Sequence, residues 1–587
     1  MTKRLILIVT IVCAYLGSFA QIGFPQQNPQ QNPEGYPEEE ATPTRNKDIS
    51  VDSMRKQLEA KKDSIIYNAT YIKFTKEEYL RDSIKLFPLD TTTQDFHRIN
   101  PLKDPEHPTM NLGVFGAAYR PMLFEPRKTI GFDMGYHFFD LYMKNPEDIR
   151  YFQARSRYTE LAYASPFGGR QEELFHVLHT QNIKPNWNVG AYFGKVGSEG
   201  YYGTANIRET AFSILNANLW NWYQSKTKRY TLLANATFNT IRAYETGSIL
   251  NDSIFREPTV VDPLYEQTRL EDDAKHQVRN NSVFIKQFLN IGKQKLLDSG
   301  EVTLPTQRVS HAFTYNTQKY FFRKETPDES GLLRNYYLYA DSTSDSTRLN
   351  HIINEFNYSF YIRGKRISLL KNELKLNVGL QHDYYNYKQY RSSRSFQNIT
   401  LKGSLNYHFS DKAGLDLDVQ QIFQGENAGD FLYEANSEIK LGKNAGKILL
   451  GVYSQNQSPW LVFEKQVTNH HRWDYNFDRT KTQSASFAYL NPKIRLQAKA
   501  EYFLVTNYLY FRNLAGDIVP DQLNSDINLL KLSLRKDFKF GKFTFANYLV
   551  YQKTDYESII RTPEIYTFHS LYMHQDFFKV LKTEFGF

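Results

Sequence analysis

Residues 493–504 and 398–409 alternate between apolar and polar side chains at nearly every position. In the first stretch the apolar residues are Ile494, Leu496, Ala498, Ala500, Tyr502 and Leu504. In the second they are Ile399, Leu401, Leu405, Tyr407 and Phe409. Successive side chains of a strand point to opposite faces, so each stretch predicts a strand with one apolar and one polar face. Such a strand suits either a soluble sheet over a core or a barrel wall between lipid and a watery lumen.

The same alternation recurs through most of the chain from about residue 110 to the end. It is clear in residues 374–381, 415–420 and 530–535, and Gly541-Lys542 separates two further strands as a hairpin turn would. Short turns alternate with long polar stretches, such as residues 250–280 and 324–350. A barrel with tight turns at one rim and long loops at the other has this pattern, and this length of chain supplies on the order of 18 strands.

The N-terminus predicts export. Lys3 and Arg4 precede an apolar run that ends near small residues, which indicates a signal peptide over residues 1–20 cleaved near Ala20. The only cysteine, Cys13, lies within it, so the mature chain has no disulfide framework. Residues 21–63 predict a disordered Pro/Gln-rich tail with a possible short helix, and residues 64–110 a periplasmic lead-in.

Export favours the barrel over the soluble sheet. After residue 20 no apolar run reaches the length of a spanning helix, and an exported chain without one crosses a membrane only as a closed barrel. A soluble sandwich stays open as an alternative, but the mixed Lys, Arg, Asp and Glu of the polar faces suit a lumen. We therefore expect an all-β fold, a transmembrane antiparallel β-barrel of roughly 16–20 strands over residues 111–587.

If the strands form a barrel, one set of side chains is expected to face the lumen and another to lie at the lipid interface. The residues that we predict to face the lumen are Lys493, Arg495, Lys499, Lys531 and Arg535. Aromatic residues make up 15% of the chain, and girdles at the lipid interface would use them. The interface aromatics we predict are Tyr136, Phe138, Phe139, Tyr142, Tyr151 and Phe152.

The sequence presents no convincing catalytic, cofactor or metal motif. His470 and His471 are adjacent, so on a strand they would face opposite ways and could not share a metal ion. Nothing singles out the Ser and His of a barrel-embedded hydrolase, and we expect no enzyme. The net charge of +9 is spread along the chain, which argues against nucleic acid as a partner, although a basic lumen would bias passage toward anions.

One part of the chain resembles the putative porin family of Bacteroidetes outer membranes. The resemblance is carried by NLGVFGAAYRPMLF (111–124), GFDMGYHFFDLY (131–142), IRYFQARSRYTELAY (149–163) and the text from 172 to 202. LDTTTQDFHRINP (89–101) and YETGSILND (244–252) add to it. The resemblance implies an outer-membrane barrel with a presumed pore, and it transfers no catalytic or binding residue.

We therefore expect a porin that lets small polar solutes or ions diffuse passively through the outer membrane. Its partners would be the lipid bilayer, the barrel assembly machinery and the solutes. Two alternatives stay open: a non-conducting barrel that serves as the scaffold of a surface or secretion complex, and a gated nutrient transporter. The latter needs a folded plug, and residues 21–110 look too short and too Pro-rich for one. The run ending at Phe587 is either the terminal strand or an interior strand of a truncated chain, and we favour truncation.

Overall fold

The computed structural model describes residues 71–587, apart from 81–84, 93–97, 155, 166–171, 201–209, 252, 254–266, 272, 293–305, 363–373, 391, 443 and 579–580. The predicted signal peptide and tail lie outside the described residues. Within the described part of the chain, no helix is both long and apolar enough to cross a membrane.

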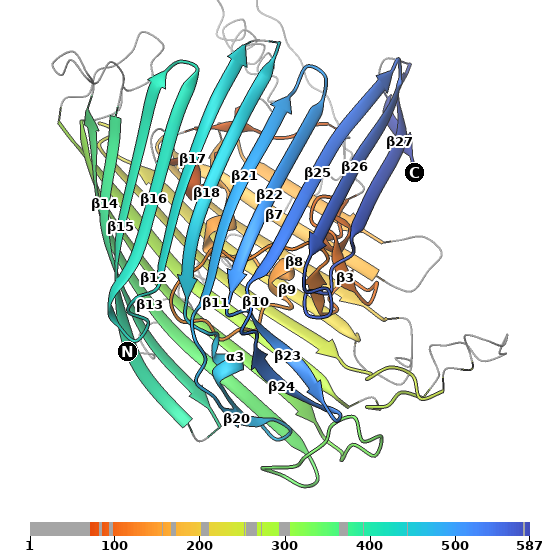
Figure 1. Ribbon diagram of the computed structural model, residues 1–587. Coiled ribbons are helices and arrows are strands. Elements are labelled where there is room, and N and C mark those ends of the chain that lie inside the picture. The colour runs from red at the N-terminus through yellow and green to blue at the C-terminus, as the bar shows by residue number, and fades with distance from the viewer. Residues whose placement is uncertain are drawn as a thin grey trace, which may run out of the picture. The chain divides into compact units, whose positions relative to one another are not determined.

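Nineteen strands of the described chain form one closed barrel (Figure 1). The first ten are β6 (Tyr158–Ala164), β7 (Glu172–Lys184), β8 (Trp187–Ser198), β9 (Phe212–Gln224), β10 (Tyr230–Tyr244), β11 (Lys275–Ile291), β12 (Gln307–Lys324), β13 (Thr343–Ile362), β14 (Leu374–Gln389) and β15 (Ser392–Ser410). The others are β16 (Ala413–Gly425), β17 (Phe431–Gly442), β18 (Gly446–Gln457), β21 (Thr480–Asn491), β22 (Leu496–Thr506), β25 (Ile527–Phe540), β26 (Phe543–Thr554), β27 (Ile565–Phe577) and β28 (Leu581–Gly586). The fold class and the strand range predicted from the sequence are confirmed.

The strands follow one another around the ring in chain order, and each consecutive pair is antiparallel. When the number of such strands is odd, the last strand runs in the same direction as the first. β6 and β28, which are neighbours where the ring closes, therefore run in the same direction.

The two rims of the barrel differ as the turn pattern predicted. Tight connections, including Gly541-Lys542 between β25 and β26, lie at what we call the short-turn rim; Gly541 there has a φ of +60°. Residues 245–274, 325–342, 458–479 and 507–526 connect strands at the opposite, long-loop rim. The long-loop rim carries the short helix α3 (Leu461–Glu464), the pair β19 (Lys465–Val467) and β20 (Arg472–Asp474), and the hairpin β23 (Leu509–Leu514) and β24 (Asp517–Gln522).

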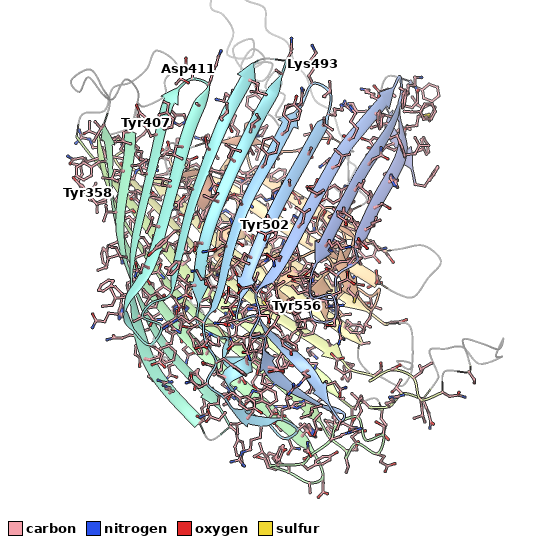
Figure 2. The ribbon with its side chains drawn as sticks, viewed as in Figure 1. Tyr358, Tyr407, Asp411, Lys493, Tyr502 and Tyr556 are labelled. Atoms are coloured by element: carbon pink, nitrogen blue, oxygen red, sulfur yellow. The ribbon has the colours of Figure 1, made fainter. Side chains whose placement is uncertain are left out.

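The apolar residues of the alternating strands face outward. On β25, Leu530, Leu532 and Leu534 are 39–41% exposed, whereas Leu529 and Lys531 on the opposite face are buried. Figure 2 shows Tyr358, Tyr407 and Tyr502, which occupy outward positions of β13, β15 and β22. β11 to β15 are 16 to 20 residues long, and a strand needs only about 10 to cross a bilayer, so these strands extend beyond the membrane.

The chain before β6 lies inside the barrel. We call the described residues of 71–157 the lumen segment; in Figure 1 its red and orange ribbon is enclosed by the strands. Its elements are β1 (Ile72–Thr75), η2 (Glu77–Leu80), β2 (Phe87–Pro88), η3 (Pro101–Lys103), β3 (Thr109–Asn111), β4 (Tyr119–Pro121), η4 (Asp140–Tyr142), η5 (Pro146–Asp148) and β5 (Tyr151–Ala154). This corrects two predictions. The barrel begins at Tyr158 rather than at residue 111, and the described residues of 71–110 lie in the lumen instead of leading into it.

Candidate functional site: the barrel lumen and its segment

Four apolar clusters bind the lumen segment to different sectors of the inner wall. The first joins Phe139 and Tyr142 to β9 and β10, and the second joins Tyr151 and Phe152 to β7, β9, β10 and β11. The third joins Phe124 to β22 and β25, and the fourth joins Met134 to β13, β14 and α3. Burial of each large apolar side chain contributes about 1.5–3 kcal/mol, so the segment is firmly packed against much of the ring.

Polar side chains of the wall hold the backbone of the same segment. Asn239 of β10 accepts a hydrogen bond from the Lys144 amide at 2.9 Å, and Gln455 of β18 donates to the Arg127 carbonyl at 3.0 Å. Gln552 of β26 accepts from the Phe124 amide at 3.1 Å. A segment without regular pairing must satisfy its backbone groups in this way when it is enclosed.

Asp430, in the loop between β16 and β17, is a hub of these contacts. Its carboxylate is fully buried and accepts hydrogen bonds from the Gly131 amide at 3.0 Å and from the Ser458 hydroxyl at 2.8 Å. Arg479 forms an ion pair with it at 3.0 Å. One carboxylate thus joins the lumen segment to two connections of the long-loop rim.

Three of the residues predicted to face the lumen lie on the inner wall, and each is paired. Lys499 contacts Glu501 at 2.7 Å. Lys531 is 3.7 Å from both Glu501 and Glu125, and it donates to the Phe124 carbonyl at 3.2 Å. Arg535 forms an ion pair with Glu106 of the lumen segment. Lys531 and Arg535 therefore hold the wall and the segment together, whereas the partner of Lys499 lies on its own strand.

Lys493 and Arg495 precede the strand, which begins only at Leu496, although Arg495 lines a cavity beside Thr91 and Thr92 of the lumen segment. Asn491 accepts a hydrogen bond from the Lys493 amide at 3.1 Å, Pro492 cannot donate, and Arg495 has a φ of +51°. Both residues thus lie in the turn between β21 and β22, and Figure 2 shows Lys493 at the short-turn rim.

The six predicted interface aromatics belong to the lumen segment and not to the outer wall. Phe139, Tyr142, Tyr151 and Phe152 are buried, and Tyr136 stacks on the inward-facing Tyr320 of β12 with ring centroids 4.4 Å apart. Phe138 contacts the same Tyr320 ring. The prediction of lipid anchors is therefore wrong: these residues fill the lumen because the barrel starts after them.

Outward aromatics near the short-turn rim were missed by the sequence argument. They occur as close pairs along single strands: Tyr358 with Phe360, Tyr407 with Phe409, and Phe538 with Phe540. The signal was present, since each pair occupies the apolar positions of its strand near the strand's C-terminal end. This position suits a girdle at the lipid interface.

His137 lies between two carboxylates of its own segment. Its Nε2 is 3.0 Å from Asp133 and its Nδ1 is 2.9 Å from Asp140, which also pairs with Arg127 at 2.7 Å. Burial lowers the pKa of His137, but the two carboxylates outweigh burial and raise its pKa to about 9. The imidazolium therefore braces residues 133–140 at neutral pH, beside Trp460 of the long-loop rim.

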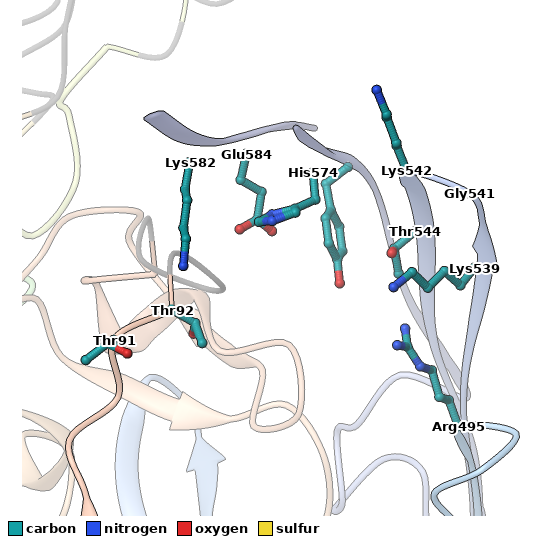
Figure 3. Close-up of a pocket in the computed structure, with 11 residues that line it drawn as sticks. Thr91, Thr92, Arg495, Lys539, Gly541, Lys542, Thr544, His574, Lys582 and Glu584 are labelled. Atoms are coloured by element: carbon teal, nitrogen blue, oxygen red, sulfur yellow. The ribbon is translucent and has the colours of Figure 1, made fainter. Parts of the chain in front are cut away.

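Within the described part of the chain, two cavities lie beside the lumen segment. The loop-side cavity, of about 500 Å³, lies between residues 119–138 and the connections of the long-loop rim. The turn-side cavity, of about 460 Å³, is lined by Thr91 and Thr92 of the segment and by inner-wall residues near the short-turn rim (Figure 3). Its wall carries Arg495, Lys539, Lys542, Lys582, His574 and Glu584, so basic groups predominate.

Among the described residues, no group of three or more His, Cys, Asp and Glu side chains is arranged to hold a metal ion. His470 is buried and contacts the Thr343 hydroxyl at 2.6 Å, whereas the neighbouring His471 is exposed.

Comparison with known proteins gives one family. A family model described as "Putative porin" matches residues 70–587. No match was found among the curated proteins. Among solved structures, the chain is similar to the siderophore receptor PirA from Acinetobacter baumannii (10% identity, TM-score 0.49, 73% of this chain and 66% of that one). It is also similar to the copper transporter OprC (12% identity, TM-score 0.49, 71% and 64%). The chain thus spans slightly less than two thirds of the length of these two proteins.

Proposed function

Since the chain belongs to the putative porin family, we propose that it is an outer-membrane transport barrel for small polar solutes in which the lumen segment acts as the gate. Its family and its apolar outer wall place it in the outer membrane. The finer claim, that passage depends on movement of the segment, is supported by the contents of the lumen.

One observation carries the proposal. The lumen segment is bound to the inner wall by four apolar clusters distributed over β7 to β11, β13, β14, β22 and β25. A channel for free diffusion needs a wetted lumen, whereas this inner wall presents Phe212, Trp220, Phe503 and Leu529 to a covering segment. Solutes of appreciable size therefore cross only when part of the segment shifts.

The irregular structure of the lumen segment favours movement of a part of it over release of the whole segment from the barrel. It is made of short strands and single helical turns, and much of it is held by side chains instead of by a sheet ladder. Such regions open at lower free energy than a long-stranded barrel wall. The earlier objection to a plug, that too little chain precedes the barrel, no longer applies because the barrel starts at Tyr158.

Two other functions make different predictions for ionic current. A permanently open porin would conduct steadily, whatever happens to the lumen segment. A scaffold barrel would conduct in no state.

Single-channel recording in planar bilayers separates these three cases. We expect wild-type protein to be closed for most of the time, with brief openings. Asp430→Asn should open more often, because it removes the charge that holds Gly131 and Ser458. Arg394→Gln, which breaks an exposed ion pair with Glu426 at the same rim, is the matched control and should behave as wild type. Steady wild-type current unaffected by Asp430→Asn, or the lack of current in every variant, would refute the proposal.

A further inference from the structure

The loop-side cavity has the size of a small-molecule site. Its floor is formed by the lumen segment from Tyr119 to Phe138, and its walls by three connections of the long-loop rim. These connections contribute residues 458–460 and 463, residues 508 and 509, and residues 559–562. A volume of about 500 Å³ lies within the range typical of pockets for ligands of a few hundred daltons.

Aromatic rings from both sides line this cavity. The lumen segment contributes Tyr119, Phe124 and Phe138, and the loops contribute Trp460, Phe463 and Tyr508. Trp460 is held between Phe463, with centroids 6.0 Å apart, and His137 at 4.9 Å. Fixed rings around an open volume provide faces on which a flat apolar group can stack.

The charges of the lining do not cancel. Glu125 is engaged by His107 at 3.3 Å and by Lys531 at 3.7 Å, and Arg127 is engaged by Asp140 at 2.7 Å. In contrast, Arg120 and Arg561 form no ion pair within the described part of the chain. Arg120 donates only to the Met110 thioether, at 2.9 Å and 3.2 Å, and Arg561 only to the Ser558 carbonyl at 3.3 Å.

These two guanidinium groups are suited to an added anion. Both side chains belong to exposed residues, so they can rotate toward a ligand without breaking a buried contact. A thioether is a weak acceptor, whereas a carboxylate or phosphate can accept two parallel bonds from one guanidinium. The cavity therefore combines ring faces with unneutralised, fork-shaped donors.

We propose that the loop-side cavity binds a small organic anion that carries an aromatic ring, with the ring among Trp460, Phe463 and Tyr508 and its acidic group on Arg120 and Arg561. That such a molecule is also a transported solute rests on the proposed function; the binding itself does not. The ligand would meet the lumen segment directly, since 11 of the 26 residues that line the cavity belong to that segment.

Phenyl phosphate is a suitable probe, with phenol and inorganic phosphate as its two halves. Of the five tryptophans only Trp460 lines the cavity, so its fluorescence reports binding to purified full-length protein in detergent. We expect saturable quenching by phenyl phosphate with a Kd at least about tenfold below those of phenol and of phosphate. Trp460→Phe should lose the quenching while calorimetry still records binding.

Arginine variants test the assignment of the acidic group. Arg120→Gln and Arg561→Gln should each weaken phenyl phosphate binding about tenfold, and Arg394→Gln should leave it unchanged. The two arginines lie in separate parts of the chain, so a folding defect in one variant leaves the other informative.

Three results would overturn the inference: equal binding of phenol, unchanged binding in both arginine variants, or no saturable binding tighter than about 1 mM. Binding without current would refute only the proposed function, and current without binding only this inference.

Discussion

At the residue scale, charged side chains of the inner wall bind the lumen segment and do not only line a channel. Lys531 and Arg535 were predicted from strand parity alone to face the lumen, and the structure gives each a carboxylate partner in the lumen segment. The face of a strand on which a residue lies follows from its position in the local alternation, so the sequence shows it directly. The partners Glu125 and Glu106 lie hundreds of positions away along the chain, and no local pattern identifies them.

The pair Arg535 and Glu106 predicts a charge-swap effect. Arg535→Glu places two carboxylates together and should loosen the segment by about 1 kcal/mol, which raises open probability several-fold. The double variant Arg535→Glu with Glu106→Arg restores attraction and should return open probability toward wild type. If the effects of the two single substitutions on open probability simply add in the double variant, the pair does not hold the lumen segment closed.

His137 predicts a pH dependence. Its pKa in the folded protein, about 9, is above the ordinary value of 6.5, so the charged form stabilises the packed segment. This contribution is fully present below pH 6.5 and is lost as pH rises through about 9; it amounts to about 2 kcal/mol because the ring is partly exposed.

Open probability should therefore rise between neutral pH and pH 10. In His137→Gln it should already be high at neutral pH and should vary little. A pH profile in this variant that matches wild type would contradict the role of His137.

At the element scale, the alternating strands were predictable and the lumen segment was not. The alternation of apolar and polar residues in a strand depends only on residues that are neighbours in the sequence. The Gly541-Lys542 turn was predictable for the same reason. The lumen segment has no regular alternation of apolar and polar residues, because its side chains have to fit the wall that surrounds it. One signal was available: the polar parity of β22 and β25 becomes apolar at Phe503, Val505, Ile527 and Leu529, which a watery lumen would not require.

The β25–β26 turn predicts a purely conformational cost. Gly541 has a φ of +60°, and a Cβ there would meet nothing within 4 Å, so Gly541→Ala should lower the unfolding free energy by about 1 kcal/mol through strain alone. Gly403→Ala in β15 is the control, since Gly403 has ordinary φ and its nearest atom would be at 4.0 Å. Equal urea midpoints for the two variants in detergent micelles would contradict this account.

At the scale of the whole molecule, the family resemblance and the barrel were predictable, but the contents of the barrel were not. The text that carries the resemblance, residues 111–124 and 131–142, forms the core of the lumen segment. Residues taken for interface anchors, such as Tyr151 and Phe152, fill the lumen because they precede the first wall strand. The central claim is therefore that this segment closes the barrel and must move for solutes to pass.

A reversible tether tests that claim most directly. A Cβ built at Gly135 would lie 3.2 Å from the Val462 Cβ, close to the spacing of about 3.8 Å in disulfides, so Gly135→Cys with Val462→Cys should link the segment to the long-loop rim. Gly135 has a φ of +85°, and the strain of about 1–2 kcal/mol at a cysteine should loosen the reduced protein. The only native cysteine is Cys13, so no cysteine of residues 71–587 competes with the introduced pair.

The measurement is single-channel current from this double variant before and after reduction. We predict that the disulfide-linked protein stays closed and that reductant restores openings at least as frequent as those of wild type, whose own current is insensitive to reductant. Identical currents in the linked and reduced states, with the disulfide verified by mass, would contradict the account.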